Sequence, residues 1–278
     1  MTEKSLFSCP ICGQGLLTEK TRLICPQGHS FDRARQGYTH LLPVNRMHSK
    51  EPGDTKEMVL SRRAFLESGA YDIFAQRLCA LSWEFLQGKN APILLDAGCG
   101  EGYYTGKMQA FLQEKGLDVQ IAGFDISKSA VRAAAGKYKR CQFAVASAFA
   151  IPMAENCVDC LTNVFAPIVP IECARVVKTG GVMILAVPGP RHLYGLKEIL
   201  YDAPYENEYR ETDYPGFAFV RRETVEDTLV LHEAHQIQNL FAMTPYYWKT
   251  PESGSRRLAQ TDHLTTEIRF DFLVYRRE

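Results

Sequence analysis

The sequence predicts an α/β fold in which a doubly wound domain follows a small cysteine-rich module. The first observation is a strand–turn–helix motif, I-L-L-D-A-G-C-G-E-G-Y-Y-T, at residues 93–105. The second is the alternation of strand-like apolar runs with helical patterns from there to residue 189, which is typical of a parallel sheet covered by helices. The third is a group of cysteine and histidine residues within 9–29, ahead of that domain.

The composition indicates an ordinary globular chain without a membrane segment. The 278 residues fit one large domain plus a small one, and the 46% apolar content is enough for a core. No apolar run is long enough to span a bilayer, and the start does not read as a secretion leader. The nine cysteines are an odd number, and several lie in apolar runs, which favours a reducing compartment. We therefore expect a cytoplasmic protein.

Breaker residues suggest where the module ends. Pro52 and Gly53 fall in a polar stretch, so we expect a module at 1–43, a linker at 44–57 and a second domain at 58–278. Net charge is zero, but the first 63 residues hold ten Lys and Arg against six Asp and Glu. This is a weak electrostatic indication of nucleic-acid binding by the module.

The turn at the centre of the chain narrows the choice of cofactor. Asp96 ends the strand, and Gly98, Gly100 and Gly102 follow it. A dinucleotide fingerprint requires a third glycine where Tyr103 stands, so a nicotinamide cofactor is disfavoured. The pattern D-x-G-x-G-x-G instead resembles the first motif of methyltransferases that use S-adenosylmethionine, in which the acid balances the ammonium of the methionine end. A purely structural turn is the alternative.

A second acid supports a nucleoside-containing cofactor. Asp125 ends the next predicted strand, where a carboxylate can accept hydrogen bonds from both ribose hydroxyls. The alternative is that it caps the helix predicted at 127–138. The two roles are compatible.

The N-terminal cysteines have the spacing of a zinc site. Cys9 and Cys12 form a C-x2-C pair, and Cys25 and His29 follow twelve residues later. Three thiolates and an imidazole make a closed tetrahedral site, which is how structural Zn²⁺ is held, and metal binding supplies folding free energy to a module with little core. Free cysteines at coincidental spacing and an iron site are the alternatives. The further pair Cys157–Cys160 lies in a strand-like run and is interpreted as core.

The order of the motifs carries a family resemblance. A zinc module, P-G-D at 52–54, R-R-A-F-L at 62–66, the motif at 95–105 and P-G-P-R-H-L at 188–193 together resemble the bacterial large-subunit (23S) ribosomal RNA guanine-N1 methyltransferases. That family includes homologues that confer macrolide resistance. The resemblance implies a Rossmann-like class I methyltransferase fold with a seven-stranded mixed sheet. It also implies methylation of a guanine in a 23S rRNA hairpin, a homodimer, and zinc modules that help to hold the RNA.

The resemblance also implies roles for individual residues. The zinc ligands are Cys9, Cys12, Cys25 and His29. Residues expected at the cofactor are Tyr71, Asp96, Gly98, Gly100, Glu101, Gly102, Asp125 and His192, the last of which also fits a helix start. Residues expected at the RNA substrate are Arg62, Arg63, Asn163, Phe165 and Pro167, although two adjacent arginines also fit a solvated helix face. The segment 201–222, rich in tyrosine and charge, has no counterpart from which to infer a role.

Methylation of guanine N1 requires loss of a proton, and the sequence assigns no general base. Asp159 and a group near Asn163 are candidates, and both residue types are equally common in structural roles. Two other functions remain open at this point. One is methylation of a small molecule, which leaves the zinc module without a purpose. The other is a non-catalytic zinc RNA-binding protein.

Overall fold

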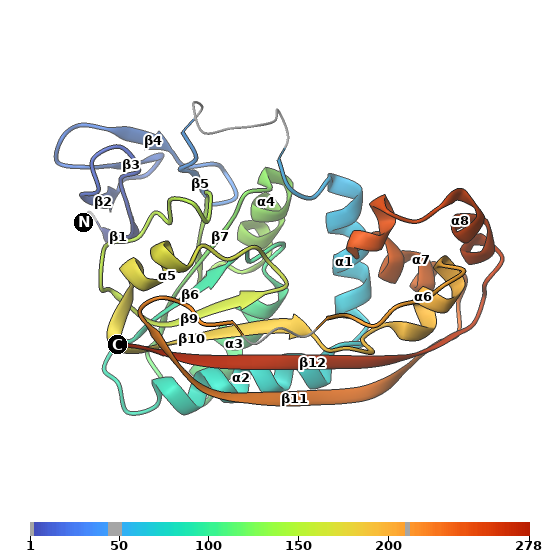
Figure 1. Ribbon diagram of the computed structural model, residues 1–278. Coiled ribbons are helices and arrows are strands. Elements are labelled where there is room, and N and C mark those ends of the chain that lie inside the picture. The colour runs from blue at the N-terminus through green and yellow to red at the C-terminus, as the bar shows by residue number, and fades with distance from the viewer. Residues whose placement is uncertain (1–2, 44–51, 209–211) are drawn as a thin grey trace.

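The computed structural model describes residues 3–43, 52–208 and 212–278. Most of the expected linker, residues 44–51, and three residues of the segment 201–222 lie outside the described part of the chain. The fold confirms the expected class, because a mixed sheet made mainly of parallel strands is covered by helices and preceded by a small β-rich module (Figure 1).

The main sheet contains the seven expected strands and one more. Its order is β11-β12-β10-β9-β6-β7-β8-β5, and β11 and β12 form an antiparallel ribbon along one edge (Figure 1). The strands are β5 (Thr39–His40), β6 (Ile93–Ala97), β7 (Gln120–Asp125), β8 (Gln142–Val145), β9 (Val158–Val164), β10 (Val177–Pro188), β11 (Phe217–Leu231) and β12 (Leu264–Arg277). The additional strand, β5, pairs in parallel with β8 although it belongs to the expected module.

The N-terminal module is a four-stranded antiparallel sheet. Its strands are β1 (Glu3–Ser8), β2 (Gly15–Thr18), β3 (Arg22–Ile24) and β4 (Ser30–Asp32). The expected hairpin between the two ligand pairs is β2–β3, with Leu17 opposite Ile24. The module shares a hydrophobic core with the main sheet, because Phe7 and Leu16 belong to the same buried cluster as Met153.

Alternate residues of the central strands face two different cores. Leu94 packs toward α2 (Asp72–Leu86) and α3 (Tyr103–Glu114), whereas Leu95 packs toward the N-terminal module and α5 (Pro170–Val176). This period of two is what a strand buried on both faces requires, and it explains why the strand sequences are apolar throughout. The remaining helix beside this sheet, α4 (Lys128–Lys137), begins at Ser127, whose hydroxyl accepts from the Ala130 N–H.

Further helices complete the described chain around α1 (Lys56–Glu67), which packs against α7 (Figure 1). They are α6 (Tyr194–Leu200), α7 (Ala234–Ala242), the 3₁₀ helix η2 (Pro245–Trp248) and α8 (Glu252–Ala259). Within the described residues, no helix has the length and apolar character needed to cross a bilayer.

The order of strands fixes where a ligand can bind. The chain runs from β6 to β7 and β8 on one side, then returns to place β9 on the other side of β6. The loops that follow β6 and β9 therefore diverge at the carboxyl ends of these parallel strands. In open α/β sheets this crevice is where ligands bind.

Candidate functional site

The turn after β6 is held close to two neighbouring segments. Backbone N–H groups of Gly98 and Cys99 donate to the Phe124 carbonyl on β7, at 2.9 and 3.0 Å. Gly98 has φ +80°, and a Cβ placed on it would lie 2.4 Å from the Cβ of Ala166 in the loop after β9. Only glycine satisfies both the left-handed backbone and this close approach.

Asp125 organises the end of β7 and the start of α4. Its two carboxylate oxygens accept from the Gly100 N–H at 3.0 Å and the Ser127 N–H at 2.8 Å. The cap of α4 is Ser127, so Asp125 supports the cap rather than providing it. Burial raises the pKa of Asp125 although the two N–H donors oppose that shift. Each oxygen retains acceptor capacity toward the cavity.

Asp96 is buried and held by two hydroxyl groups. It accepts from Thr105 Oγ1 at 2.5 Å and from Thr162 Oγ1 at 3.0 Å. Burial raises its pKa to about 6, against the lowering effect of both hydroxyls. A cation bound beside this carboxylate offsets the cost of burying it.

These residues line a cavity of about 510 Å³, within the usual size range for small-molecule sites. Its charged side chains are Asp54, Arg62, Asp96, Glu101 and Asp125. The remaining lining residues are Gly53, Met58, Leu66, Tyr71, Gly98, Cys99, Gly100, Tyr103, Tyr104, Ile126, Val164, Phe165, Ala166, Pro167, Met243, Thr244, Pro245 and Trp248.

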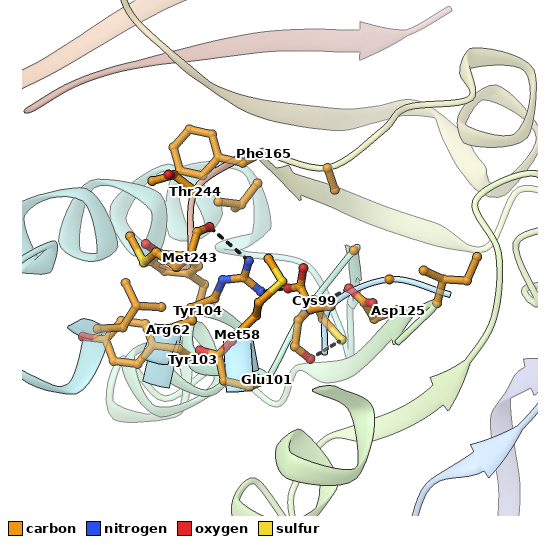
Figure 2. Close-up of a pocket in the computed structure, with 18 of the residues that line it drawn as sticks. Met58, Arg62, Cys99, Glu101, Tyr103, Tyr104, Asp125, Phe165, Met243 and Thr244 are labelled. Atoms are coloured by element: carbon orange, nitrogen blue, oxygen red, sulfur yellow. Dashed lines mark hydrogen bonds and ion pairs between the residues drawn. The ribbon is translucent and has the colours of Figure 1, made fainter. Parts of the chain in front are cut away.

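Arg62 lies inside this cavity, and Figure 2 shows its guanidinium group between Met243 and the glycine turn. It forms an ion pair with Asp54 and donates to the Met243 carbonyl at 3.4 Å. Partial burial opposes a charge on Arg62, but Asp54 and Glu101 outweigh it and raise the pKa, so the side chain is a permanent, partly buried cation. Arg63 points elsewhere and donates to the Ala133 carbonyl of α4.

Two buried polar atoms of the cavity have no hydrogen-bond partner in the described structure. They are the Tyr71 hydroxyl and Glu101 Oε1. Buried side-chain polar atoms are nearly always paired, so these two are suited to hydrogen-bond groups of a bound ligand. A molecule with an ammonium, a carboxylate and a ribose matches the donors and acceptors present, and S-adenosylmethionine carries all three.

Two residues expected at the cofactor do not line the cavity. His192 lies behind it, against Tyr71 and Phe165, with ring centroids 6.1 Å from each. Its Nδ1 accepts from the Arg269 N–H at 3.3 Å, and burial lowers its pKa to about 3, so the imidazole is neutral. Gly102 faces α4, where an added Cβ would lie 2.8 Å from that of Ala134.

The loop after β9 brings together the residues expected at the substrate. Asn163 is buried, and its side-chain amide donates to the carbonyls of Ala97 at 3.1 Å and Pro167 at 3.4 Å, which fixes the loop. Phe165 is 45% exposed and adopts φ +53°, so its ring stands at the cavity wall. Asp159 lies at the opposite end of β9, paired with Lys89 and Lys178, and does not face the cavity.

Several cavity residues were missed from the sequence. Asp54 belongs to the P-G-D motif, which was noted only as part of a resemblance. Met243 and Trp248 come from the far end of the chain, where nothing local marks them. Met58, Arg62 and Leu66 form an i, i+4, i+8 stripe on α1, and this spacing was the available signal.

The four N-terminal ligands form a cluster with the dimensions of a zinc site. His29 Nδ1 lies 3.5 Å from Cys9 Sγ and 3.4 Å from Cys25 Sγ, and Cys12 Sγ lies 3.7 Å from Cys25 Sγ. Tetrahedral zinc requires sulfur–sulfur separations of about 3.8 Å and sulfur–nitrogen separations of about 3.6 Å. Within the described residues this is the one group of at least three potential metal ligands, so Cys157 and Cys160 do not form another.

We predict that one zinc ion per chain stabilises the N-terminal module. Cys12→Ser should abolish stoichiometric zinc, because the three ligands that remain bind the metal more weakly than four. Without the metal, the amides of residues 3–43 should exchange faster. Metal content by mass spectrometry and amide exchange measure both effects. Cys157→Ser, outside the cluster, is the control and should retain the ion. Full zinc content in the Cys12 variant would contradict the assignment.

We predict that Asp96 lowers stability near neutral pH. The pKa of this carboxyl is 3.8 in the unfolded chain and about 6 in the folded one. Its contribution to the free energy of unfolding is therefore fully present below pH 3.8 and lost as the pH rises through about 6. Without cofactor, Asp96→Asn should therefore be more stable than the wild-type chain at pH 7.5, by up to about 3 kcal/mol. The gain should be smaller at pH 5. Chemical unfolding at both pH values measures this, with exposed Asp118→Asn as control. A variant less stable at both values would refute it.

Comparisons with known proteins agree with this architecture. Residues 7–50 match the family model described as RlmA, N-terminal, a zinc ribbon, and residues 89–234 match a methyltransferase domain model. A Streptomyces fradiae protein named 23S rRNA (guanine(748)-N(1))-methyltransferase is 34% identical, covering 91% of this chain and 89% of the relative.

Two further relatives carry names of the same enzyme class. One, from Micromonospora griseorubida, is 35% identical over 69% of this chain and 68% of its own length. The other, from Bacillus subtilis (strain 168), is 27% identical over 97% and 96%. The similarity spans nearly the whole chain, and the two family models cover the zinc cluster and the glycine turn after β6. The chain therefore belongs to the family of 23S rRNA guanine-N1 methyltransferases.

Proposed function

We propose that this chain transfers a methyl group from S-adenosylmethionine to N1 of one guanine in 23S ribosomal RNA. The observation that carries the proposal is the cavity at the strand switch point, where buried acids and a partly buried arginine lie beside an apolar wall. The zinc cluster and the reaction named for the relatives support an RNA substrate. An rRNA substrate also implies a cytoplasmic protein.

The proposed cofactor contacts follow from charge. Asp96 accepts the ammonium of the methionine end, and Arg62 binds its carboxylate in exchange for part of its pairing with Asp54. Asp125 accepts the ribose hydroxyls with the acceptor capacity that its two backbone partners leave. The unpartnered Tyr71 hydroxyl and Glu101 Oε1 provide further hydrogen bonds. This proposal places Arg62 at the cofactor, whereas the sequence led us to expect it at the RNA.

The chain contributes alignment and desolvation to the reaction. The bound cofactor supplies an electrophilic methyl group on a sulfonium. The walls formed by the loop after β9 and by residues 243–248 hold the acceptor base, and orientation of this kind is worth several kcal/mol. Those walls contain no carboxylate or imidazole among the residues that line the described cavity. We therefore assign no side chain as general base for the N1 proton, which is released to water.

The proposal extends to the module and to assembly. The zinc module, fixed on the main sheet, holds the RNA while the cavity receives the target guanine, and two chains form a homodimer. Light scattering of the purified chain tests the assembly. The lysines and arginines of the first 63 residues support RNA binding by the module, and the family resemblance supports both statements.

We predict a single reverse-transcription stop on protein-free 23S rRNA after incubation with S-adenosylmethionine. Methylation of guanine N1 blocks base pairing, so the transcriptase halts at the modified nucleotide. The experiment combines methyl incorporation from labelled cofactor with mapping of stops, and Asp96→Ala is the control without activity.

Other outcomes of this experiment are equally clear. Incorporation without a stop would mean methylation away from the pairing edge. Cofactor binding without incorporation into any RNA form would move the activity to a small-molecule acceptor. Absence of cofactor binding would leave a zinc RNA-binding protein.

We predict that Arg62 distinguishes S-adenosylhomocysteine from 5′-methylthioadenosine, which lacks the amino-acid end. Arg62→Met should raise the Kd for S-adenosylhomocysteine roughly 30-fold or more, because a buried charge pair is lost, and leave the Kd for methylthioadenosine unchanged. Calorimetry measures both values. Arg63→Met, the adjacent residue outside the cavity, is the matched control. Equal weakening of both ligands would mean that Arg62 only maintains the shape of the cavity.

A further inference from the structure

Trp248 is exposed at the cavity although its size and ring favour burial. It is one of two tryptophans in the chain, it is 67% exposed, and it lines the cavity from η2. An exposed aromatic ring that shares a groove with other apolar side chains is typical of a binding surface. The family comparisons and the sequence motifs assign no role to it.

The helix that carries Trp248 is firmly anchored. Tyr246 is buried, and its ring centroid lies 5.6 Å from the ammonium of Lys197, which is itself fully buried. Lys197 donates to the Tyr205 carbonyl and to Asn207 Oδ1, both at 2.8 Å, so it joins η2 to the segment after α6. These contacts hold η2 in place, so the exposure of the Trp248 indole follows from the position of the helix.

A second exposed ring lines the same cavity from another element. Phe165, in the loop after β9, is backed by Phe74 and His192 in near-parallel stacking, at centroid distances of 5.8 and 6.1 Å. Figure 2 shows Phe165 near Thr244, on the side of the cavity away from Asp125. Rings held by other rings keep their orientation when a planar ligand arrives.

Charge is distributed unevenly along the cavity. The ionised acids and bases that line it are Asp54, Arg62, Asp96, Glu101 and Asp125, and they belong to the part proposed for the cofactor. Arg62 marks the border of that part, where it donates to the Met243 carbonyl at 3.4 Å. The lining residues near the two rings are apolar or neutral, namely Val164, Ala166, Pro167, Thr244 and Pro245. A neutral, flat ring suits this end, and a phosphate or a charged metabolite does not.

We propose that Trp248 and Phe165 form a base subsite in which Trp248 stacks on the target guanine after the nucleotide leaves the RNA helix. The inference rests on the proposed function, since it names the residue that receives the acceptor. An extruded base loses its stacking in the RNA, and an aromatic side chain restores it. Phe165 was expected at the substrate, whereas Trp248 is new.

Kinetics of Trp248 variants test this subsite. Stacking on one aromatic side chain changes affinity about 5- to 150-fold on replacement by alanine. Trp248→Ala should therefore reduce kcat/KM for protein-free 23S rRNA by at least 5-fold, while the Kd for S-adenosylhomocysteine remains at the wild-type value. Trp248→Phe should recover most of the loss. Phe219→Ala, an exposed aromatic on β11 that does not line the cavity, is the control and should retain activity.

Fluorescence gives a readout that does not depend on turnover. In a Trp83→Phe background, Trp248 is the remaining tryptophan. With S-adenosylhomocysteine bound, guanosine should quench its emission in a saturable manner, and uridine, with its smaller ring, should quench it less. The same titration with Trp83 retained and Trp248→Phe should give no saturable signal.

The possible results separate the two levels of inference. Wild-type kinetics in Trp248→Ala together with unquenched emission would overturn the subsite and leave the proposed function intact. Equal loss in Trp248→Ala and in cofactor affinity would also overturn it, because the residue would then support the cavity as a whole. Failure of the wild-type chain to methylate RNA would overturn the proposed function and the subsite with it.

Discussion

The site depends on the close approach of two backbone turns at the strand switch point. Gly98 leaves no space for a side chain beside Ala166, and the loop after β9 therefore lies against the turn after β6. Asn163 maintains this approach through its hydrogen bonds to the carbonyls of Ala97 and Pro167. Because of that contact, the acids at the strand ends and the ring of Phe165 line one cavity. A larger residue at 98 would separate the methyl donor from the acceptor.

The same geometry forces charge into a poorly solvated space. Asp96, Glu101 and Asp125 all have raised pKa values, with burial as the first cause of each. Arg62 opposes this in part, since it lowers the pKa of Glu101 and Asp125. Hydroxyl and backbone donors supply the rest of the compensation. The arrangement is costly without a ligand, and a bound zwitterion with an ammonium and a carboxylate reduces that cost. Relief of this electrostatic cost therefore contributes to the binding free energy of the cofactor.

The sequence predicted the features that depend on local spacing. Strand, turn and helix at 93–105 and the ligand pairs of the zinc cluster are encoded within a few residues, so their periods and intervals are visible without the fold. Features made by distant segments were not. Trp248 lies 152 residues after Asp96, and its place in the cavity depends on the buried Lys197. Arg62 belongs to both cases. Its place in an i, i+4, i+8 stripe on α1 is a local pattern visible in the sequence, whereas its ion pair with Asp54 depends on the fold.

The zinc module and the domain that holds the cavity are joined by noncovalent contacts as well as by the chain itself. The Ser8 N–H donates to the Pro152 carbonyl at 2.9 Å, and β5 extends the main sheet beside β8, so the zinc module is fixed on the sheet. Beyond the undescribed linker residues, Gly53 packs against the start of α4, and Ser127 Oγ donates to the Asp54 carbonyl at 2.8 Å. Gly53 and Asp54, which follow those residues, therefore belong to the cavity wall. This attachment supports the proposal that the zinc module and the cavity act on one RNA, because a module fixed on the sheet keeps a constant position relative to the site.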